Sequence, residues 1–500
     1  MQSTFRSDRR ALGILAILLA QGLIVGCPGG GGEPKKGKQV LLDTDFDDAR
    51  LGAEAADHMA SEMGLIDDPA LNAYVQAIGR RMVPFAPPRP FEYKFFIVDQ
   101  EAPNAFALPG GYIYISRGLI ALANSEDELA GVIGHEITHA ADRHTAGRQE
   151  YEGRLSPLSL GYMRYAQIAA YGRDQERDAD RGGQILASRA GWDPMAMARF
   201  LQDLGAMDRA TTGVSRLPSY FDSHPSTPER AATAASRAES LQWQPREHIA
   251  PTQADFLHRL EGLVVGQNPA EGIFEGQRFL HRDMDFSLRF PDGWQLINTR
   301  EAVGAIEPTG QAFVALRHAG PGNDPQAVAQ QFVQGELRQA RGKVRHEQTI
   351  QVGDLPAYRL EIEAGAIKSG GQVTFIAYED SVYRIDMIAR AADAAKYEGR
   401  GRAVVRSLRP LTDEEKAAFE ITRLHIVQGK AGESLEALSL RTKNALPLGT
   451  TAVINDLFIN SQVAEGQLIK IGVAEPYVPR PETPRKIEAP RPIRKQTPEA

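Results

Sequence analysis

Hydrophobic side chains recur with helical spacing after Ser125, and this pattern predicts a helix with one side turned toward a core. Glu128 follows Ser125 by three residues, which is the capping-box pattern that starts a helix. The hydrophobic positions at this spacing are Leu129, Val132, Ile133 and Ile137. His135 and His139 lie four residues apart in the same stretch, so their rings are expected on one face of the helix, one turn apart.

Alternation of hydrophobic and polar residues predicts strands elsewhere. Residues 106–115 are expected to form one strand, with a bulge or turn at Pro109, Gly110 and Gly111. Further alternation occurs at Met284, Phe286, Leu288 and Phe290, and again at Tyr358, Leu360 and Ile362.

Residues 273–412 combine strand and helix patterns, and we expect one α+β domain there. Residues 373–379 and 382–388 predict a hairpin that turns at positions 380 and 381. Residues 326–341 predict an amphipathic helix, and residues 391–408 predict a helix that closes the domain.

The N-terminus carries a short hydrophobic run behind a positively charged region, as a bacterial signal peptide does. The run of 15 residues at positions 12–26 is short for a membrane span and ends in the sequence IVGC at Cys27. This ending resembles a bacterial lipobox, whose cysteine is lipidated and becomes the first mature residue. The alternative is a signal anchor with a chance cysteine. We expect residues 1–26 to be a lipoprotein signal peptide and residues 27–42 to be a flexible tether.

A lipidated Cys27 would anchor the protein to a membrane from the periplasm. Pro28 follows the cysteine where an aspartate would favour the inner membrane, so the outer membrane is favoured. No later segment of the sequence is apolar over the roughly 18 residues that a membrane-spanning helix needs.

Length and composition limit the number of domains and the classes of partner. A chain of 500 residues is too long to fold around one hydrophobic core, so about two to four domains are expected. The net charge of -7 gives no reason to expect a nucleic-acid partner. Cys27 is the only cysteine, which excludes an intramolecular disulfide.

Glu136 directly follows His135, which gives the pattern HExxH that is typical of a zinc site. Imidazole nitrogens at positions i and i+4 can both reach one zinc ion at about 2.0–2.1 Å. Glu136 lies about 100° further round the helix, where it can approach a water on zinc without binding the metal. The alternative is a pair of helix histidines with ordinary hydrogen-bond partners.

A third protein ligand decides between these interpretations. The continuation HExxHxxGxxH fails, because Asp142 and Thr145 stand at the glycine and histidine positions and His144 is one residue out of register. Glu176 and Asp180 are also four residues apart, so they share a helix face. Glu176 can complete a site with one open position, and Asp180 can hold the distal N–H of a ligand histidine. The alternative is a solvated run of charges on a surface helix.

Four segments occur in the order found in HtpX/BepA-type zinc metallopeptidases, and the chain resembles that family over about residues 43–239. The segments are NAFALPGGYIYISRGLI (104–120), SEDELAGVIGHEITHAADRH (125–144), ERDAD (176–180) and SHPSTPER (223–230). The resemblance implies a gluzincin fold over residues 43–262, which is a mainly helical domain with a small sheet above the zinc helix. It also implies one Zn²⁺ per chain, and its metal ligands would be His135, His139 and Glu176.

The resemblance assigns further roles near the zinc. In the family, the strand that follows Asn104 edges the cleft and pairs with the substrate backbone, so Asn104, Gly110 and Gly111 would bind substrate. The alternative is a plain core strand. His224 and Arg230 would lie in a loop beside the zinc. His224 would either stabilise the oxyanion or fill the open metal position and keep the enzyme inactive, and the alternative is a surface histidine.

These residues predict a zinc-dependent endopeptidase. Glu136 would act as general base on a water activated by zinc and would pass the proton to the leaving amine. The expected substrates are unfolded or misassembled periplasmic and outer-membrane proteins, in quality control or turnover. The alternative is a latent protease that acts mainly as a chaperone or scaffold for envelope proteins or the cell wall.

Three segments are expected after the peptidase domain. Residues 273–412 begin with FSLRFPDGW, which weakly resembles PsbP-like domains, and we expect a binding or packing module there. Residues 418–473 resemble a LysM-like βααβ module. LysM modules bind glycans that contain N-acetylglucosamine, so peptidoglycan is a candidate partner. Residues 474–500 are rich in proline and are expected to be disordered.

Overall fold

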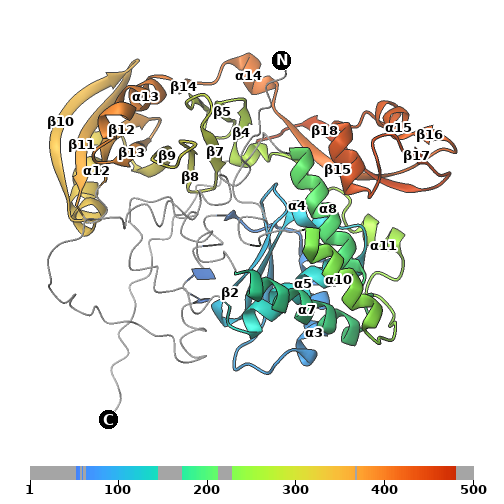
Figure 1. The fold of residues 1–500 in the computed structure, drawn as a ribbon. Coiled ribbons are helices and arrows are strands. Elements are labelled where there is room, and N and C mark those ends of the chain that lie inside the picture. The colour runs from blue at the N-terminus through green and yellow to red at the C-terminus, as the bar shows by residue number, and fades with distance from the viewer. Residues whose placement is uncertain are drawn as a thin grey trace, which may run out of the picture.

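The structure is a computed structural model that describes residues 52–53, 55–56, 59, 63–144, 172–211, 224, 228–365 and 369–479. Cys27, the tether and residues 480–500 lie outside the described residues. Figure 1 shows a first region of helices in blue and green, a sheet-rich region in yellow and orange, and a C-terminal module in red. This mixed α+β organisation, with a helical region followed by a sheet-rich one, is the predicted fold class.

The first region is mainly helical and contains a small sheet. Its helices are α3 (Pro69–Met82), α4 (Arg117–Leu122), α5 (Glu126–Ala141), α7 (Arg173–Ala190), α8 (Ala196–Thr211), α10 (Pro228–Ser240) and α11 (Gln253–His258). Its strands are β1 (Lys94–Val98), β2 (Ala105–Leu108) and β3 (Tyr112–Ser116). The central strand β3 runs parallel to β1 and antiparallel to β2, so β2 forms one edge of the sheet.

The segment predicted as one strand at residues 106–115 is two strands, so the single strand is wrong, while the turn predicted at Pro109, Gly110 and Gly111 is confirmed. The strands β2 and β3 are joined by a short 3-10 turn, η2 (Pro109–Gly111). Gly110 and Gly111 have φ angles of 76° and 83° there, which glycine adopts without the clash that a Cβ would cause. A Cβ on Gly111 would also lie 2.7 Å from the Phe91 ring. The turn accounts for both glycines, and their contact with substrate stays a prediction.

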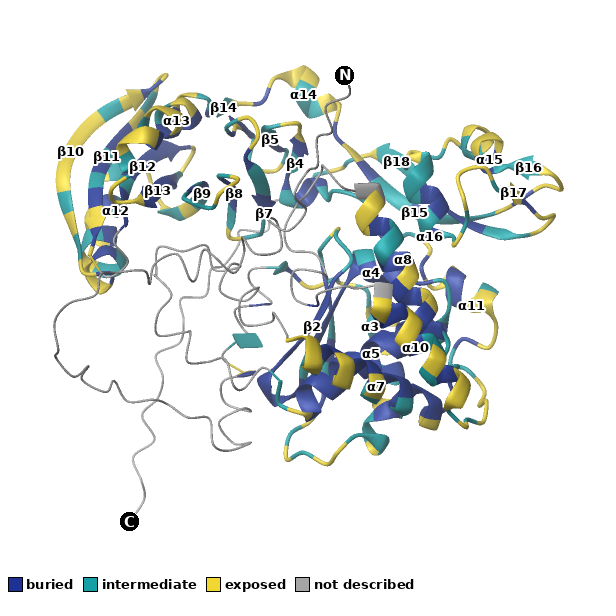
Figure 2. Ribbon diagram, viewed as in Figure 1, coloured by how far each residue is buried: buried dark blue, intermediate teal, exposed yellow. Residues whose placement is uncertain are grey.

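The zinc-motif helix α5 is the buried helix that the hydrophobic pattern predicts. Every residue of α5 except Asp127 is buried, because α3, α7, α8 and the sheet all pack against it (Figure 2). The side chain of Ser125 accepts a hydrogen bond from the backbone N–H of Glu128 at 3.2 Å, as a helix cap does. The Glu128 carboxylate accepts instead from the N–H of Asn124 at 2.7 Å, one residue earlier than a capping box requires.

Glycines let α5 and α7 approach backbone to backbone. A Cβ on Gly183 of α7 would lie 2.6 Å from the backbone nitrogen of His135. A Cβ on Gly134 of α5 would lie 2.9 Å from the carbonyl oxygen of Gly183. The helix that carries both HExxH histidines is therefore held directly against the helix that carries Glu176.

The second region consists of two antiparallel sheets with helices α12 (Pro325–Phe332) and α13 (Ala394–Arg406). Its strands are β4 (Ile273–Glu275), β5 (Arg278–His281), β6 (Phe286–Arg289), β7 (Gln295–Asn298), β8 (Ala302–Ile306), β9 (Ala312–Pro321), β10 (Gly342–Val352), β11 (Leu355–Ala364), β12 (Ser369–Tyr378), β13 (Ser381–Arg390) and β14 (Arg409–Pro410). The strand order is β10-β11-β12-β13-β9-β8-β7 in the seven-stranded sheet and β14-β6-β5-β4 in the four-stranded sheet. The outer strand β10 is exposed along most of its length (Figure 2).

The C-terminal module follows the short helix α14 (Asp413–Ala417) and packs against the first region. Its elements are β15 (Glu420–Gln428), β16 (Glu433–Ser434), α15 (Leu435–Thr442), α16 (Leu448–Ile454), β17 (Gln462–Val463) and β18 (Leu468–Pro476). The strands β15 and β18 pair antiparallel, and both helices lie between them in the sequence. Leu424 of β15 exchanges backbone hydrogen bonds of 2.8 Å with Gly262 and Leu263. In the described part of the chain, no helix is both long and apolar enough to cross a membrane.

Candidate metal centre

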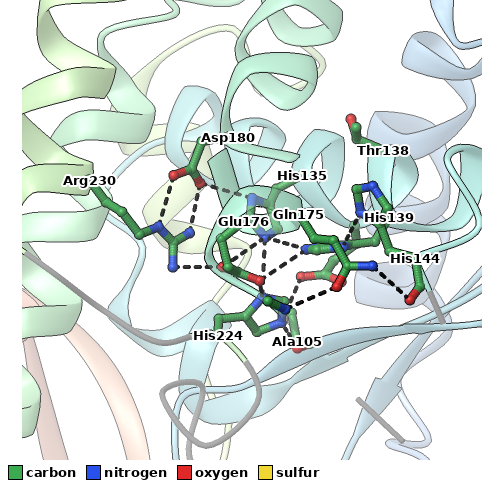
Figure 3. Close-up of polar contacts among 12 residues, drawn as sticks. Ala105, His135, Thr138, His139, His144, Gln175, Glu176, Asp180, His224 and Arg230 are labelled. Carbon is green, nitrogen blue, oxygen red and sulfur yellow. Dashed lines mark hydrogen bonds and ion pairs between the residues drawn. The ribbon is translucent and has the colours of Figure 1, made fainter. Parts of the chain in front are cut away.

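Three segments bring four candidate metal ligands into one buried cluster (Figure 3). His135 and His139 lie on α5. Glu176 lies in the first turn of α7, and His224 precedes α10. One ligand atom from each residue lies within 4.8 Å of the others, and all four side chains are buried. The sequence-predicted ligands are therefore close together in space.

The distances suit a tetrahedral zinc site. His135 Nε2 lies 2.9 Å from His139 Nε2 and 3.2 Å from His224 Nδ1. Glu176 Oε1 lies 3.4 Å from His139 Nε2 and 2.9 Å from His224 Nδ1. Ligand atoms about 2.0–2.1 Å from one zinc ion, at tetrahedral angles, lie about 3.3 Å from each other. Both this spacing and the imidazole and carboxylate donors fit zinc.

Two charged residues behind the cluster orient its members. Asp180 Oδ1 lies 3.0 Å from His135 Nδ1, so the carboxylate can accept the proton on the nitrogen that points away from the cluster. Arg230 donates to both oxygens of Asp180, at 2.8 and 2.7 Å, and its Nη1 lies 2.7 Å from Glu176 Oε2. The prediction that Arg230 lies in a loop is wrong, because α10 begins at Pro228 and holds Arg230 in its first turn.

Glu136 lies beside the cluster without belonging to it. Its side chain is fully buried, and neither carboxylate oxygen has a hydrogen-bond partner among the described residues. His224 Nε2 is 3.6 Å from its Oε1. Burial raises the pKa of Glu136, and the nearby His224 opposes this shift. Because burying a carboxylate without partners is costly, a water molecule or substrate group is expected at this position.

Burial and neighbouring charges set the protonation of the other cluster members. Burial lowers the pKa of His139 well below its usual value. Burial alone would raise the pKa of Glu176, but His224 and His139 hold it well below its usual range. Neutral imidazole and ionised carboxylate are the forms in which these residues bind zinc.

His224 connects the cluster to the edge strand β2. Its Nδ1 faces the cluster, while its Nε2 lies 3.2 Å from the carbonyl oxygen of Ala105. The carbonyl of the preceding Asn104 accepts a hydrogen bond from the N–H of Ser116, where β3 ends. Because successive carbonyls of a strand point in opposite directions, the Ala105 carbonyl faces the open edge of the sheet. His224 thus occupies a main-chain position at which another strand would pair.

Two further residues complete the surroundings of the site. Asn104 is buried next to β2, and its Oδ1 has no hydrogen-bond partner among the described residues. Its binding of substrate stays a prediction. The sequence does not predict the contact of His144, whose Nδ1 lies 2.9 Å from His139 Nδ1. The only signal for it in the sequence is the spacing of five residues after His139.

Two histidines one helical turn apart, a glutamate from a second helix and an intervening glutamate outside the cluster define the site of a zinc metallopeptidase. Residues 69–170 and 158–238 match the model of peptidase family M48. This part of the chain is therefore similar to the zinc metallopeptidases of family M48, and the cluster of His135, His139, Glu176 and His224 lies within the matched residues.

Known proteins are similar in sequence to part of the chain. It is 32% identical over 223 residues to the beta-barrel assembly-enhancing protease of Yersinia pestis, which covers 40% of this chain and 44% of that protein. It is 24% identical over 243 residues to the mitochondrial metalloendopeptidase OMA1 of Schizosaccharomyces pombe, which covers 45% and 69%. The chain thus spans less than half the length of the first relative. The solution structure of cyanobacterial PsbP from Synechocystis sp. PCC 6803 aligns with 29% of this chain and 98% of its own, at 11% identity and a TM-score of 0.24.

Proposed function

We propose that the protein is a zinc-dependent endopeptidase that acts on proteins of the cell envelope. The observation that carries this proposal is the fully buried carboxylate of Glu136, without a hydrogen-bond partner among the described residues, beside a cluster that fits zinc. The proposed ligands are His135, His139 and Glu176. Asp180 and Arg230 hold these ligands in position through the contacts described above.

The residues of the chain account for the proton transfers of peptide hydrolysis. A zinc ion held by the three ligands would polarise the scissile carbonyl and lower the pKa of its water to about 7. Glu136 accepts a proton from the attacking water, and burial favours this uptake because it raises the pKa of the carboxyl. The remaining hydroxyl joins the carbonyl carbon. Glu136 then donates its proton to the amine as the C–N bond breaks.

The edge strand β2 supports an extended, unfolded segment as substrate. Such a segment can pair with the open edge through main-chain hydrogen bonds, which gives little sequence preference. Asn104 precedes this edge, and the turn at Gly110 and Gly111 follows it. Because a relative is a beta-barrel assembly-enhancing protease, we include misassembled β-barrel proteins among the proposed substrates. The activity would then serve quality control or turnover in the envelope.

We further propose that His224 keeps the resting enzyme inactive. Its Nδ1 lies 3.2 Å from His135 Nε2, where it can fill the fourth coordination position of the metal. Its Nε2 lies 3.2 Å from the Ala105 carbonyl, which a paired substrate backbone would need as an acceptor. One ring therefore blocks both the water position and the edge strand. A substrate or a partner has to displace it before hydrolysis.

The parts around the peptidase domain suggest where it acts. We propose a lipid anchor at Cys27 and a site of action at the periplasmic face of the outer membrane. Mass spectrometry of the mature protein tests the anchor, because a chain that starts before an unmodified Cys27 would contradict it.

We propose residues 273–412 as an accessory domain and residues 418–473 as a LysM-like contact to peptidoglycan. Failure to sediment with purified peptidoglycan would contradict that contact.

The experiment that tests the peptidase proposal is the variant Glu136→Gln. An amide cannot accept the proton, so hydrolysis of casein should fall by about 10²-fold or more while one zinc per chain remains. Casein cleavage and elemental analysis of the purified protein measure the two outcomes. Asp178→Asn is a matched control on the exposed side of α7, and it should keep full activity.

The same experiment separates the peptidase from a chaperone or scaffold. Undiminished casein hydrolysis in Glu136→Gln would show that another residue is the base. Wild-type protein that binds zinc but hydrolyses neither casein nor denatured envelope proteins would favour the scaffold. Accumulated envelope proteins in a strain that carries Glu136→Gln would identify the natural substrates.

A further inference from the structure

The end of α5 brings a third histidine against the HExxH motif (Figure 3). After α5 ends at Ala141, the chain turns at Arg143, whose φ of 56° is left-handed. The backbone N–H of His144 then donates to the carbonyl oxygen of His139 at 3.0 Å. The Nδ1 atoms of these two rings lie 2.9 Å apart. His144 is thus attached to His139 through both backbone and ring.

Contacts from α7 help to maintain this turn. A left-handed backbone is unfavourable for a residue with a Cβ, so it persists only where surrounding contacts hold it. Gln175 Nε2 donates to the carbonyl oxygen of His144 at 3.3 Å. Gln175 directly precedes Glu176, so the helix that supplies the third proposed ligand also holds the turn that positions His144.

The tautomer of His139 decides whether this residue can bind a metal. Its Nε2 points into the cluster, 2.9 Å from His135 Nε2 and 3.4 Å from Glu176 Oε1. A ligand nitrogen must offer its lone pair, so a neutral His139 that binds through Nε2 carries its proton on Nδ1. At 2.9 Å one of the two facing Nδ1 atoms donates and the other accepts. With zinc on Nε2, the Nδ1–H of His139 would therefore donate to Nδ1 of His144.

We propose that His144 is a positioning residue that fixes His139 in the tautomer and orientation required for zinc binding. This inference rests on the proposed zinc site. His144 is not one of the four clustered residues, and it would act through His139 as Asp180 acts through His135. Loss of a partner of this kind typically weakens metal binding by about 10–100-fold.

The test compares two substitutions of His144 that differ in one property. His144→Leu removes the acceptor, whereas His144→Asn can place its side-chain oxygen where Nδ1 lies. Zinc affinity is measured by competition with a chelator, and the absorption spectrum of the Co²⁺-loaded protein reports the ligand geometry. We expect His144→Leu to bind zinc about 10–100-fold more weakly with an altered cobalt spectrum, and His144→Asn to restore both properties.

A matched control is His248→Leu. The Nε2 of His248 lies 2.9 Å from Asp127 at the opposite end of α5, so this histidine also contacts the zinc helix but not the cluster. Its loss should leave the zinc affinity and the cobalt spectrum unchanged. Circular dichroism of every variant shows whether the fold is intact, so that a lost affinity is not confused with unfolding.

Two results would overturn the inference. Wild-type affinity and spectrum in His144→Leu would show that His139 does not depend on the ring contact. Equal weakening of zinc binding in His144→Leu and His144→Asn would show that packing matters and the acceptor does not.

The variant His139→Ala tests the zinc site on which the inference rests. If it binds zinc like the wild type, the zinc site itself is wrong. If it loses zinc while His144→Leu retains it, only the inference about His144 fails.

Discussion

At the scale of single residues, the ring of His224 joins the two parts of the site that a substrate must reach. One of its nitrogens faces His135 in the cluster, and the other contacts the carbonyl of Ala105 at the edge of the sheet. If substrate pairs with β2 as proposed, this contact has to break first. The proposed gate would then couple binding at the strand to opening of the metal position through one side chain.

The variant His224→Ala separates a gate from a catalytic role. If the ring blocks the site, the basal rate of casein hydrolysis should rise by roughly tenfold or more, because the competent state is then no longer a minor population. If the ring stabilises the oxyanion, kcat should instead fall by about 10²–10³. His258→Ala, which changes an exposed histidine of the same region, is the control and should leave the rate unchanged. A rate within about twofold of the wild type would remove both roles from His224.

The local sequence predicts those site residues whose positions follow from one helix. His135, Glu136 and His139 are placed by helical spacing alone, and all three lie at or beside the cluster. Glu176 could be selected because a second carboxylate follows it by one turn. The contacts of His144 and of the Ala105 carbonyl were not predicted. The first depends on a left-handed turn, and the second involves main-chain atoms that carry no side-chain signal.

At the scale of elements, the distance between α5 and α7 sets the size of the metal cluster. His135 and His139 project from one helix and Glu176 from the other, so a change in their separation moves the ligands apart. Gly183 permits the close approach, because a Cβ there would lie 2.6 Å from the backbone nitrogen of His135. Backbone atoms cannot rotate away as a flexible side chain can.

Gly183→Ala is therefore expected to push the helices apart. The added methyl group should lower the free energy of unfolding by about 1–3 kcal/mol, as overpacking does. Zinc affinity should fall with it, because Glu176 moves away from both histidines. Denaturant unfolding and chelator competition measure the two effects. Gly205→Ala in α8 is the control, since the nearest atom to its Cβ is the flexible end of Arg209 at 3.4 Å. Unchanged zinc affinity in Gly183→Ala would show that the helix spacing does not limit the site.

Secondary structure was predicted best where the periodicity is long and uninterrupted. The helix α5 begins where its cap predicts, and β11 covers the alternating positions from Tyr358 to Ile362. The strand expected at residues 106–115 is divided into two, because the two glycines form the turn, which was one of the two alternatives that the sequence left open. The middle of the outer strand β10 carries exposed polar side chains on both faces over residues 345–349, so it shows no alternation from which it could be predicted.

At the scale of the whole molecule, a buried lysine links the C-terminal module to the peptidase region through hydrogen bonds. Lys470 of β18 is fully buried, and its Nζ donates to the carbonyl oxygens of Ala121, Leu122 and Ala123, at 2.9, 3.2 and 2.8 Å. These carbonyls lie at the end of α4, immediately before α5. Burial lowers the pKa of Lys470 to about 7, and the nearby carboxyls of Glu128 and Asp203 oppose this shift.

The sequence did not predict this docking. A single lysine in a strand is usually solvent-exposed, and its partners lie 347 to 349 residues away along the chain. The backbone pairing of Leu424 with Gly262 and Leu263 cannot be predicted from side-chain patterns either, because it involves only main-chain atoms. Segments expected to be separate domains therefore share a boundary that only the three-dimensional structure reveals.

Lys470→Met keeps a side chain of similar length but removes the three donated hydrogen bonds. The Leu122 carbonyl keeps a hydrogen bond from Asn124 Nδ2 at 3.3 Å. We expect the free energy of unfolding to fall by about 2 kcal/mol or more, because each buried polar group left without a partner costs roughly 1–3 kcal/mol. The C-terminal module should also become accessible to limited proteolysis under conditions in which the wild type is protected. Lys430→Met changes an exposed lysine of the same module and should alter neither measurement. Unchanged unfolding and protection in Lys470→Met would mean that the backbone pairing of Leu424 and the packing of apolar side chains hold the module in place without the lysine.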